Sequence, residues 1–351
     1  MMVAIVTDAW EPQVNGVVTT MRNTREHLQQ MGHEVLMITP DQFHSIPCPY
    51  YKEIRLSLKP FRKLSKLMEY GQPDVIHIST EGPLGYAANR FCIRNGLPFT
   101  TSLHTRFPEY IRMRAPIPLG ASYSYLRNFH ATARNTLVRT ATQKAELEER
   151  GFQHLRVWPG AVDTGLFRPR GKDALKLPRP ISMYMGRVAI EKGIDAFLRL
   201  DLPGSQVVVG GGPDLEKLKS RYPRAVFLGP KYGEELAGIV SAADVFVFPS
   251  RTDTFGLTML EAMACGVPVA AFPVPGPNDL IINQSTGFLN EDLRSAILYA
   301  LRLNSDACIK FALNYSWERS TQRFLSNQTI IPRRTSGRSG TTNLESASRS
   351  C

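Results

Sequence analysis

The sequence predicts an α/β protein in which two doubly wound domains, each built on a parallel sheet, face each other across a cleft. The chain has 351 residues, and since single hydrophobic cores stop growing near ~250–300 residues, two domains are expected. Short β-branched runs alternate with helical stretches, which favours parallel sheets covered by helices on both faces. A proline-rich stretch interrupts this alternation near the middle of the chain, and the alternation then starts again.

The first domain is expected at residues 1–168. Residues 3–6 form a short β-branched run. A helical stretch then opens at Gly16 and ends at Gly32, a residue type favoured just after helices. Further strands are expected at residues 34–39, 74–78 and 99–102, with a helix over about residues 84–94.

Residues 169–180 are the expected linker, because prolines enclose a short charged stretch there. In the second domain, residues 181–314, strands are expected at residues 181–185, 206–209, 225–228, 245–248 and 267–271. The expected helices cover residues 194–200, 214–221, 234–242, a stretch ending near Ala264, 292–303, 305–313 and 315–325. Residues 331–351 hold too few apolar side chains to offset the entropy of ordering, so disorder is predicted there.

Composition and cysteine usage indicate a soluble, cytoplasmic protein. Hydrophobic residues make up 43% and charged residues 21% of the chain, as in ordinary globular proteins. No apolar run approaches the ~18–20 residues that span a bilayer, and residues 1–10 read as a strand rather than a signal peptide. The five cysteines are scattered without a C-x-x-C pair, which predicts neither a zinc site nor a disulfide scaffold.

The net charge of +11 is unevenly distributed. Residues 50–140 hold 14 Lys and Arg against 5 Asp and Glu, whereas residues 1–49 hold 2 against 5. Such a patch attracts anionic lipid or phosphorylated substrates, or it serves only solubility. No groove-reading motif accompanies the charge, so nucleic acid is not expected as a partner. A dinucleotide-dependent oxidoreductase is also disfavoured, because no G-x-G-x-x-G follows the first strand.

Two segments of the second domain predict a site for a diphosphate. Residues 186–193 follow a strand and open a helix, and they bring Arg187 and Lys192 to the end of that strand. A guanidinium fork and an ammonium point charge aimed at one spot suit a diphosphate. Gly211 and Gly212 lie in another turn between strand and helix, where a backbone without side chains allows close approach by phosphate or sugar.

A third segment carries two carboxylates eight positions apart, Asp253 and Glu261. Asp253 stands before an expected helix N-terminus, where the N–H groups of Phe255, Gly256 and Leu257 would face phosphate oxygens. Carboxylates also accept hydrogen bonds from the vicinal hydroxyls of sugar and ribose. The alternative is that Asp253 caps the helix and Glu261 is a solvated helix residue.

These segments resemble a known family. The motifs GRVAIEKG (186–193), VGGGP (209–213) and DTFGLTMLEAMACGVPV (253–269) are similar to the donor domain of the retaining GT-B glycosyltransferases of family four. TDAWEPQVNGVV (7–18) and TEGPLG (80–85) resemble the branch of α-mannosyltransferases and sulfoquinovosyl-diacylglycerol synthases, which glycosylate lipids. The similarity covers about residues 3–325 and implies two Rossmann-like domains, with residues 315–330 crossing back to the first.

The resemblance also implies roles for individual residues. Arg187 and Lys192 would neutralise the donor diphosphate, Glu261 would hold the ribose, and Asp253, where the family usually has Glu, would contact the donor sugar. Together with His104, near the transferred sugar, these cations and Asp253 form the expected catalytic set. The further donor-binding residues implied are Gly16, Gly211, Gly212, Leu228, Gly229, Pro230, Thr254, Phe255, Gly256 and Leu257. The residues expected on the acceptor side are Asn15, Glu81, Arg106 and Tyr110.

The activity that the resemblance implies is retaining transfer of a hexose from a UDP- or GDP-linked sugar to a membrane lipid such as diacylglycerol. No D-x-D sequence is present to hold a metal on the diphosphate, so no metal and no other cofactor is expected. The alternatives are a nucleotide-sugar 2-epimerase of the same fold and a transferase that acts on a polysaccharide or a soluble acceptor.

Basic and aromatic residues are interleaved in the first domain, which predicts a peripheral protein on the inner face of the cytoplasmic membrane. Residues 61–68 mix three cations with apolar residues at helical spacing. The second stretch holds Tyr110, Ile111, Arg112, Arg114, Tyr123, Tyr125, Arg127, Phe129 and Arg134. Such helices suit an anionic headgroup layer, where each cation adds ~1 kcal/mol. The alternative is that the aromatic residues belong to the core.

Overall fold

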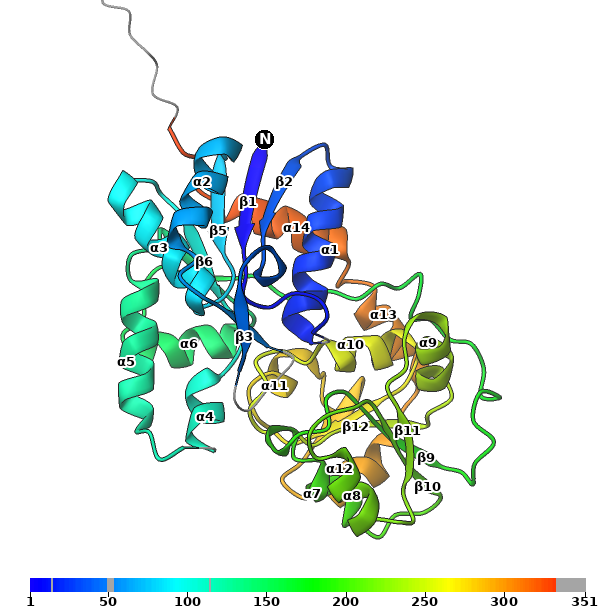
Figure 1. The fold of residues 1–351 in the computed structure, drawn as a ribbon. Helices are drawn as coiled ribbons and strands as arrows, with labels where there is room; N and C mark the ends of the chain where they lie inside the picture. Colours follow the sequence, from blue (N-terminus) through cyan, green and yellow to red (C-terminus); the bar gives the residue numbers. More distant parts are fainter. Residues whose placement is uncertain (14, 49–53, 114, 333–351) are drawn as a thin grey trace, which may run out of the picture.

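The computed structural model describes residues 1–13, 15–48, 54–113 and 115–332, and it contains two doubly wound domains (Figure 1). The first domain has a sheet of six parallel strands in the described part of the chain. In spatial order these are β2 (Glu34–Ile38), β1 (Met2–Val6), β5 (Val75–Ile78), β6 (Thr100–Leu103), β7 (Asn135–Val138) and β8 (Leu155–Val157). Their residues are mostly buried, as expected for a sheet covered on both faces.

The second domain repeats this architecture with another described sheet of six parallel strands. In spatial order these are β11 (Val226–Gly229), β10 (Ser205–Val209), β9 (Ile181–Met185), β12 (Val245–Phe248), β13 (Val269–Ala271) and β14 (Gly287–Leu289). The chain order along this sheet reverses between β9 and β12. Ligands of such folds bind at this reversal, outside the carboxyl ends of the strands.

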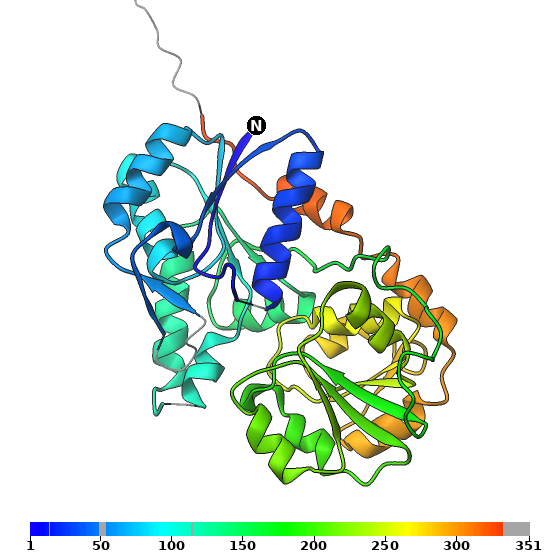
Figure 2. The same cartoon turned by 45° about the vertical axis from the view of Figure 1, so that its right-hand side comes forward.

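Helices cover both sheets (Figures 1 and 2). Those of the first domain are α1 (Gly16–Gln30), α2 (Phe61–Gly71), α3 (Pro83–Asn95), α4 (Phe107–Arg112), α5 (Leu119–His130) and α6 (Ala141–Glu149), with a 3₁₀ turn at Pro40–Gln42. Those of the second are α7 (Ile194–Leu198), α8 (Leu215–Arg221), α9 (Gly233–Ser241), α10 (Leu257–Ala264), α11 (Pro277–Leu280), α12 (Leu293–Ala300) and α13 (Ser305–Ala312), with a 3₁₀ turn at Ile190–Lys192. None of the described helices is long and apolar enough to cross a membrane.

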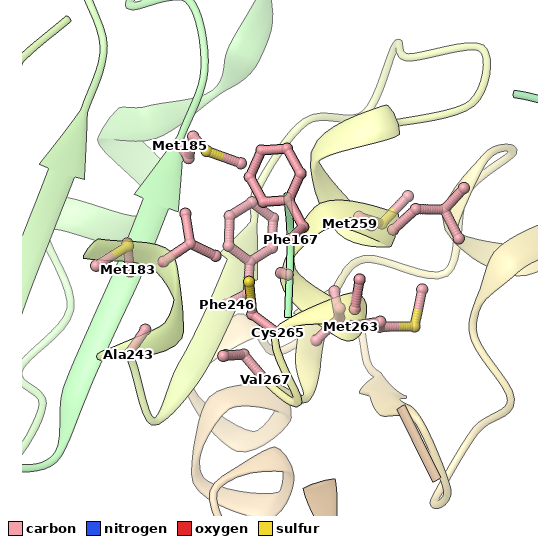
Figure 3. Close-up of a cluster of buried hydrophobic side chains, with 14 of the residues drawn as sticks. Phe167, Met183, Met185, Ala243, Phe246, Met259, Met263, Cys265 and Val267 are labelled. Carbon is pink, nitrogen blue, oxygen red and sulfur yellow. The ribbon is translucent and has the colours of Figure 1, made fainter. Parts of the chain in front are cut away.

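The core of the second domain includes residues from the segment that leads into it. Figure 3 shows the rings of Phe167 and Phe246 between Met183 and Met185 on one side and Met259 on the other. Val162 and Phe167, which the sequence places in the first domain, are therefore buried among second-domain side chains.

The last helix, α14 (Trp317–Ser326), returns to the first domain, as the fold class predicts (Figure 1). Phe324 is fully buried with Val3 and Ile5 of β1, and Ser320 accepts a hydrogen bond from the Trp158 indole through its carbonyl oxygen at 3.0 Å. The segment that leads into the second domain lies beside the segment that leads back to the first, because Val162 N–H donates to the Tyr315 carbonyl oxygen at 2.9 Å. The tail predicted to be disordered lies outside the described residues from residue 333 onward.

The strand positions expected from the sequence are present, but several short elements were missed. The sequence did not predict β7, β8, β14, the antiparallel hairpin β3 (Ser45–Pro47) and β4 (Arg55–Ser57), or helices α4, α5, α6 and α11. Most of these elements have three to six residues, too few for a periodic pattern to stand out.

Candidate functional site

The loops after β9 and β12 meet at the point where the strand order of the second sheet reverses. The hydroxyls of Ser250 and Thr252 donate to the carbonyl oxygen of Glu191 at 3.3 and 3.2 Å. Gly193 has φ +62°, and a Cβ there would lie 2.7 Å from the Pro249 carbonyl oxygen. Only glycine fits this approach without strain, so local backbone packing places residues 186–193 against the loop that contains Asp253.

Lys192 and Asp253 form an ion pair at this junction, with Nζ and Oδ1 2.6 Å apart. Burial, the largest single cause, would lower the pKa of Lys192, but the Asp253 carboxylate together with Tyr110 and Tyr184 raises that pKa above its ordinary value. The second carboxylate oxygen, Oδ2, is buried and has no hydrogen-bond partner in the part of the chain that is described. Arg187 follows β9 in the same loop, where its carbonyl oxygen accepts from the Tyr184 hydroxyl at 2.7 Å.

The glycine-rich turn after β10 is required by its neighbours in the sheet. Gly210 has φ +136°, and a Cβ there would lie 1.9 Å from the Gly186 carbonyl oxygen. Gly211 accepts a hydrogen bond from Val188 N–H at 2.8 Å, and Gly210 N–H donates to Gly229 at 2.9 Å. The turn therefore holds the loop of Arg187 in place, and Gly211, which the resemblance assigns to the donor, takes part through its carbonyl oxygen.

Gly212 and the predicted nucleobase border, Leu228, Gly229 and Pro230, lie at the same sheet edge. A Cβ at Gly212 would lie 2.3 Å from the Val188 carbonyl oxygen, and Pro230 Cγ lies 3.1 Å from a Cβ built on Gly211. Pro230 is exposed, whereas Leu228 is half-buried against the core. The three loops after β9, β10 and β11 thus form one continuous edge.

Helix α10 does not fit the alternative in which Asp253 caps it. Its first residue is Leu257 and its N-cap is Gly256, so Asp253 is not the cap that one interpretation proposed. Phe255 is 4% exposed and belongs to the core of the domain, where its apolar ring is buried. Glu261 is not a solvated residue either, since burial raises the pKa of its carboxyl to about 7.

In the first domain, Asp8 joins the two motifs that follow β1 and β5. Its carboxylate accepts from Leu84 N–H at 2.9 Å, Gly85 N–H at 3.2 Å and the Thr80 hydroxyl at 2.9 Å, so it holds the first turn of α3. Burial raises the pKa of Asp8 to about 6, although these hydrogen bonds oppose the shift. The sequence did not single out Asp8, because its partners lie more than 70 positions away.

The expected acceptor-side residues have varied positions. Asn15 caps α1, where its side-chain oxygen accepts from Val17 and Val18 at 3.0 and 3.1 Å, and a Cβ on Gly16 would lie 3.5 Å from Leu257 of α10. Glu81 lies 3.2 Å from His130 Nε2 in a nearly buried pair.

Arg106 faces its own domain, where it pairs with Glu146 and lies 3.9 Å from Glu109. These contacts fix the side chain within the first domain, and its role toward the acceptor stays a prediction. The two acid partners come from α4 and α6, helices that the sequence did not predict.

His104 and Tyr110 of the first domain lie against the loops after β9 and β12 of the second. The Thr254 hydroxyl donates to the His104 carbonyl oxygen at 2.6 Å, and the His104 ring nitrogen Nε2 lies 2.7 Å from the Ser102 hydroxyl. Burial, followed by the charge of Arg139, holds the pKa of His104 well below its ordinary value, so the ring is neutral. Burial raises the pKa of Tyr110 to about 12, and its phenol lies in the field of Lys192 and Asp253.

The basic and aromatic surface predicted for membrane binding is only partly exposed. Leu64 and Met68 of α2 are buried in the core, as is Phe129 of α5, because the apolar stripe of each helix faces its sheet. Tyr123 donates to Glu109 at 2.6 Å. The apolar side chains of this region that do reach the surface are Tyr86, Ile93, Phe107, Ile111, Met113, Ile117 and Tyr125. Arg112 and Arg127 lie among them and are exposed, and Arg114 lies outside the described residues.

Two facing Rossmann-like domains with a returning C-terminal helix and a site at their common edge define the GT-B class. The crystal structure of HepE from Anabaena in complex with UDP and glucose shares this fold. The TM-score is 0.69 at 16% identity, and the match covers 93% of this chain and 98% of that one. The sequence profile described as Glycosyltransferase Family 4 matches residues 14–166, and that described as Glycosyl transferases group 1 matches residues 179–303.

Curated relatives agree with these profiles. A GDP-mannose-dependent alpha-mannosyltransferase of Mycobacterium tuberculosis is 32% identical over 82% of this chain and 83% of its own length. An alpha-monoglucosyldiacylglycerol synthase of Streptococcus pneumoniae is 26% identical over 87% of this chain and 79% of its own length. The chain belongs to glycosyltransferase family 4, and it is a glycosyltransferase that takes its sugar from a nucleotide-sugar donor.

Proposed function

We propose that the protein transfers a hexose from a UDP- or GDP-linked donor to a membrane lipid such as diacylglycerol, with retention and without a metal ion. The observation that supports this most is the junction of Lys192, Asp253 and Tyr110. It combines a cation for the leaving group, a carboxylate oxygen without a partner among the described residues and a residue of the opposite domain.

The donor's diphosphate is expected at the edge formed by the loops of β9 and β12. Lys192 and Arg187 would stabilise the negative charge that develops as the diphosphate leaves, which is the largest contribution that preorganised groups make to such a reaction. Oδ2 of Asp253 can accept a hydrogen bond from a hydroxyl of the donor sugar while Oδ1 stays paired with Lys192. Glu261 would accept the ribose hydroxyls in its ionised form.

Retention follows from attack on the face that the leaving group occupies. The acceptor oxygen forms the new bond to the anomeric carbon as the bond to the phosphate oxygen breaks, and the acceptor proton passes to that phosphate oxygen. No protein nucleophile is needed. His104, which burial and the nearby charge of Arg139 hold neutral, would orient a sugar hydroxyl rather than add a second positive charge.

A lipid acceptor is supported by the exposed face of α3, α4 and α5. Its exposed apolar side chains are interleaved with Arg112 and Arg127, a combination suited to the headgroup layer of an anionic membrane. The name of the pneumococcal relative indicates that it makes a glycosylated diacylglycerol, and the two chains share most of their length.

The direct test is incubation of the purified protein with diacylglycerol-containing vesicles and a panel of labelled UDP- and GDP-hexoses. A labelled lipid whose anomeric configuration matches that of the donor supports the proposal. Transfer only to a soluble sugar or polysaccharide would contradict the lipid acceptor, and conversion of the donor without any acceptor would indicate a 2-epimerase.

A further inference from the structure

Arg139 is a buried cation to which the described residues offer no opposite charge. It follows the last residue of β7, is 3% exposed, and its guanidinium forms neither a salt bridge nor a hydrogen bond with any residue that the structure describes. One terminal nitrogen, Nη1, is fully enclosed and has no acceptor in the part of the chain that the structure describes. Burial lowers the pKa of Arg139 to about 9, which still leaves the group charged at neutral pH.

The two domains enclose this guanidinium together. It lies over the Trp158 ring of the first domain at 5.0 Å and over the Phe255 ring of the second at 5.4 Å. Gly160 allows this arrangement, because a Cβ there would lie 2.4 Å from Phe255. Phe255 stands two residues before the start of α10, so Arg139 reaches the donor loop from the opposite domain.

Ring faces compensate only part of the cost of burying such a charge. Removing an ion from water is strongly unfavourable unless an opposite charge and hydrogen bonds replace the solvent. Cation–π contacts stabilise a buried cation by much less than the free energy that its removal from water costs. The planar fork of an arginine is suited to phosphate oxygens, and under the proposed function the anion that enters between the domains is the diphosphate of the donor.

We propose that Arg139 binds a phosphate oxygen of the nucleotide-diphosphate donor from the first domain, which under the proposed function is the acceptor domain. This inference rests on the proposed function. The diphosphate then contacts cations of both domains, Arg187 and Lys192 on one side and Arg139 on the other. Donor occupancy thereby favours the arrangement in which the domains are in contact, and it relieves the unpaired charge.

The test replaces Arg139 by methionine, which keeps the length and the contact with both rings but removes the charge, and by lysine, which keeps the charge but not the fork. Arg156→Met, an exposed position of the neighbouring strand β8, is the matched control. Titration calorimetry with UDP and with GDP should show affinity for the bound nucleotide reduced about 10- to 100-fold in Arg139→Met, the scale of a charge-assisted hydrogen bond. Arg139→Lys should lose less, and the control nothing.

Two further readouts separate phosphate binding from a purely structural role. The unliganded Arg139→Met protein should melt at the same temperature as the wild type or higher, because a buried unpaired charge has been removed. Binding of uridine and guanosine, which lack phosphate, should be unaffected. A lower melting temperature with an unchanged nucleotide affinity would show that Arg139 only holds the aromatic rings, and would overturn the inference while leaving the proposed function intact. If the wild type binds neither UDP nor GDP, both the inference and the proposed function are wrong.

Discussion

The donor domain holds its cation Lys192 against Asp253 at 2.6 Å, whereas the acceptor domain holds Arg139 without a partner among the described residues. The first charge is balanced within one domain before any ligand arrives. By the inference above, the charge of Arg139 is balanced when the diphosphate of the donor enters between the domains. Under the proposed function, the second domain is organised before the donor binds, whereas the first domain depends on the donor to complete its side of the site.

The largest effect on turnover is expected from the cations of the second domain. Lys192→Ala and Arg187→Ala should each lower kcat about 10²-fold or more, because each removes charge stabilisation of the leaving diphosphate. Lys217→Ala, an exposed lysine of the same domain, is the control. Steady-state kinetics with thermal melts checks both variants, since Lys192→Ala leaves the Asp253 carboxylate unpaired. Near-normal kcat in both would remove these residues from the mechanism.

The same contrast explains which parts of the site could be predicted from the sequence. The donor loops are continuous segments whose glycines are required by nearby backbone, as at Gly193 and Gly210, so a local motif identifies the whole loop. Asp8 and Thr80 are 72 positions apart, and no local pattern indicates that they meet.

Arg139 was missed for a similar reason. It follows the four-residue strand β7, which the sequence did not predict, and a lone arginine after a short apolar run has no distinguishing spacing. The alternative that Asp253 caps α10 arose because an aspartate shortly before a helix resembles an N-cap, whereas its carboxylate is held by Lys192. In both cases a contact with a residue distant in sequence decides the role.

The second largest effect is expected on membrane binding, where the exposed arginines of the first domain should contact anionic lipid headgroups. Replacing both Arg112 and Arg127 by Glu should weaken sedimentation with anionic vesicles by about 20-fold or more at low salt, since each surface cation contributes ~1 kcal/mol. The matched control is Lys217→Glu with Arg224→Glu on the donor domain, which are also exposed. Wild-type protein should be released near ~0.5 M salt, where the screening length is only a few ångströms. Equal binding of wild type to neutral and anionic vesicles would contradict an electrostatic contact.

A smaller effect is expected at Glu261, the buried carboxyl of the donor domain. Its pKa is raised from 4.5 to about 7, so its protonated form favours the fold, and this contribution is lost as the pH rises from about 4.5 through about 7. Glu261→Gln should therefore gain thermal stability relative to wild type between pH 5 and pH 8. The substitution should weaken UDP or GDP binding about 10-fold at pH 8, because a carboxylate that accepts ribose hydroxyls is lost.

The pH profile distinguishes this role from simple packing. Wild-type affinity for the nucleotide should increase as the pH rises through about 7, while the affinity of Glu261→Gln stays flat. Glu216→Gln on α8, an exposed position, should change neither the nucleotide affinity nor its dependence on pH. A wild-type affinity that is constant from pH 5 to pH 8 would rule out the ionised carboxylate as the ribose acceptor.

The smallest expected effect is that of removing metal ions, and it tests whether protein cations alone serve the diphosphate. The chain has no D-x-D sequence, while Lys192, Arg187 and, by the inference above, Arg139 supply positive charge from both domains. Turnover should therefore be unchanged in excess EDTA. The measurement should be repeated with Lys192→Ala, because a divalent ion in solution can substitute for a missing cation on the diphosphate. If the activity of the wild type falls on chelation and returns with added metal, Lys192, Arg187 and Arg139 together are insufficient for the diphosphate. The cationic mechanism would then have to be replaced by one that includes the metal.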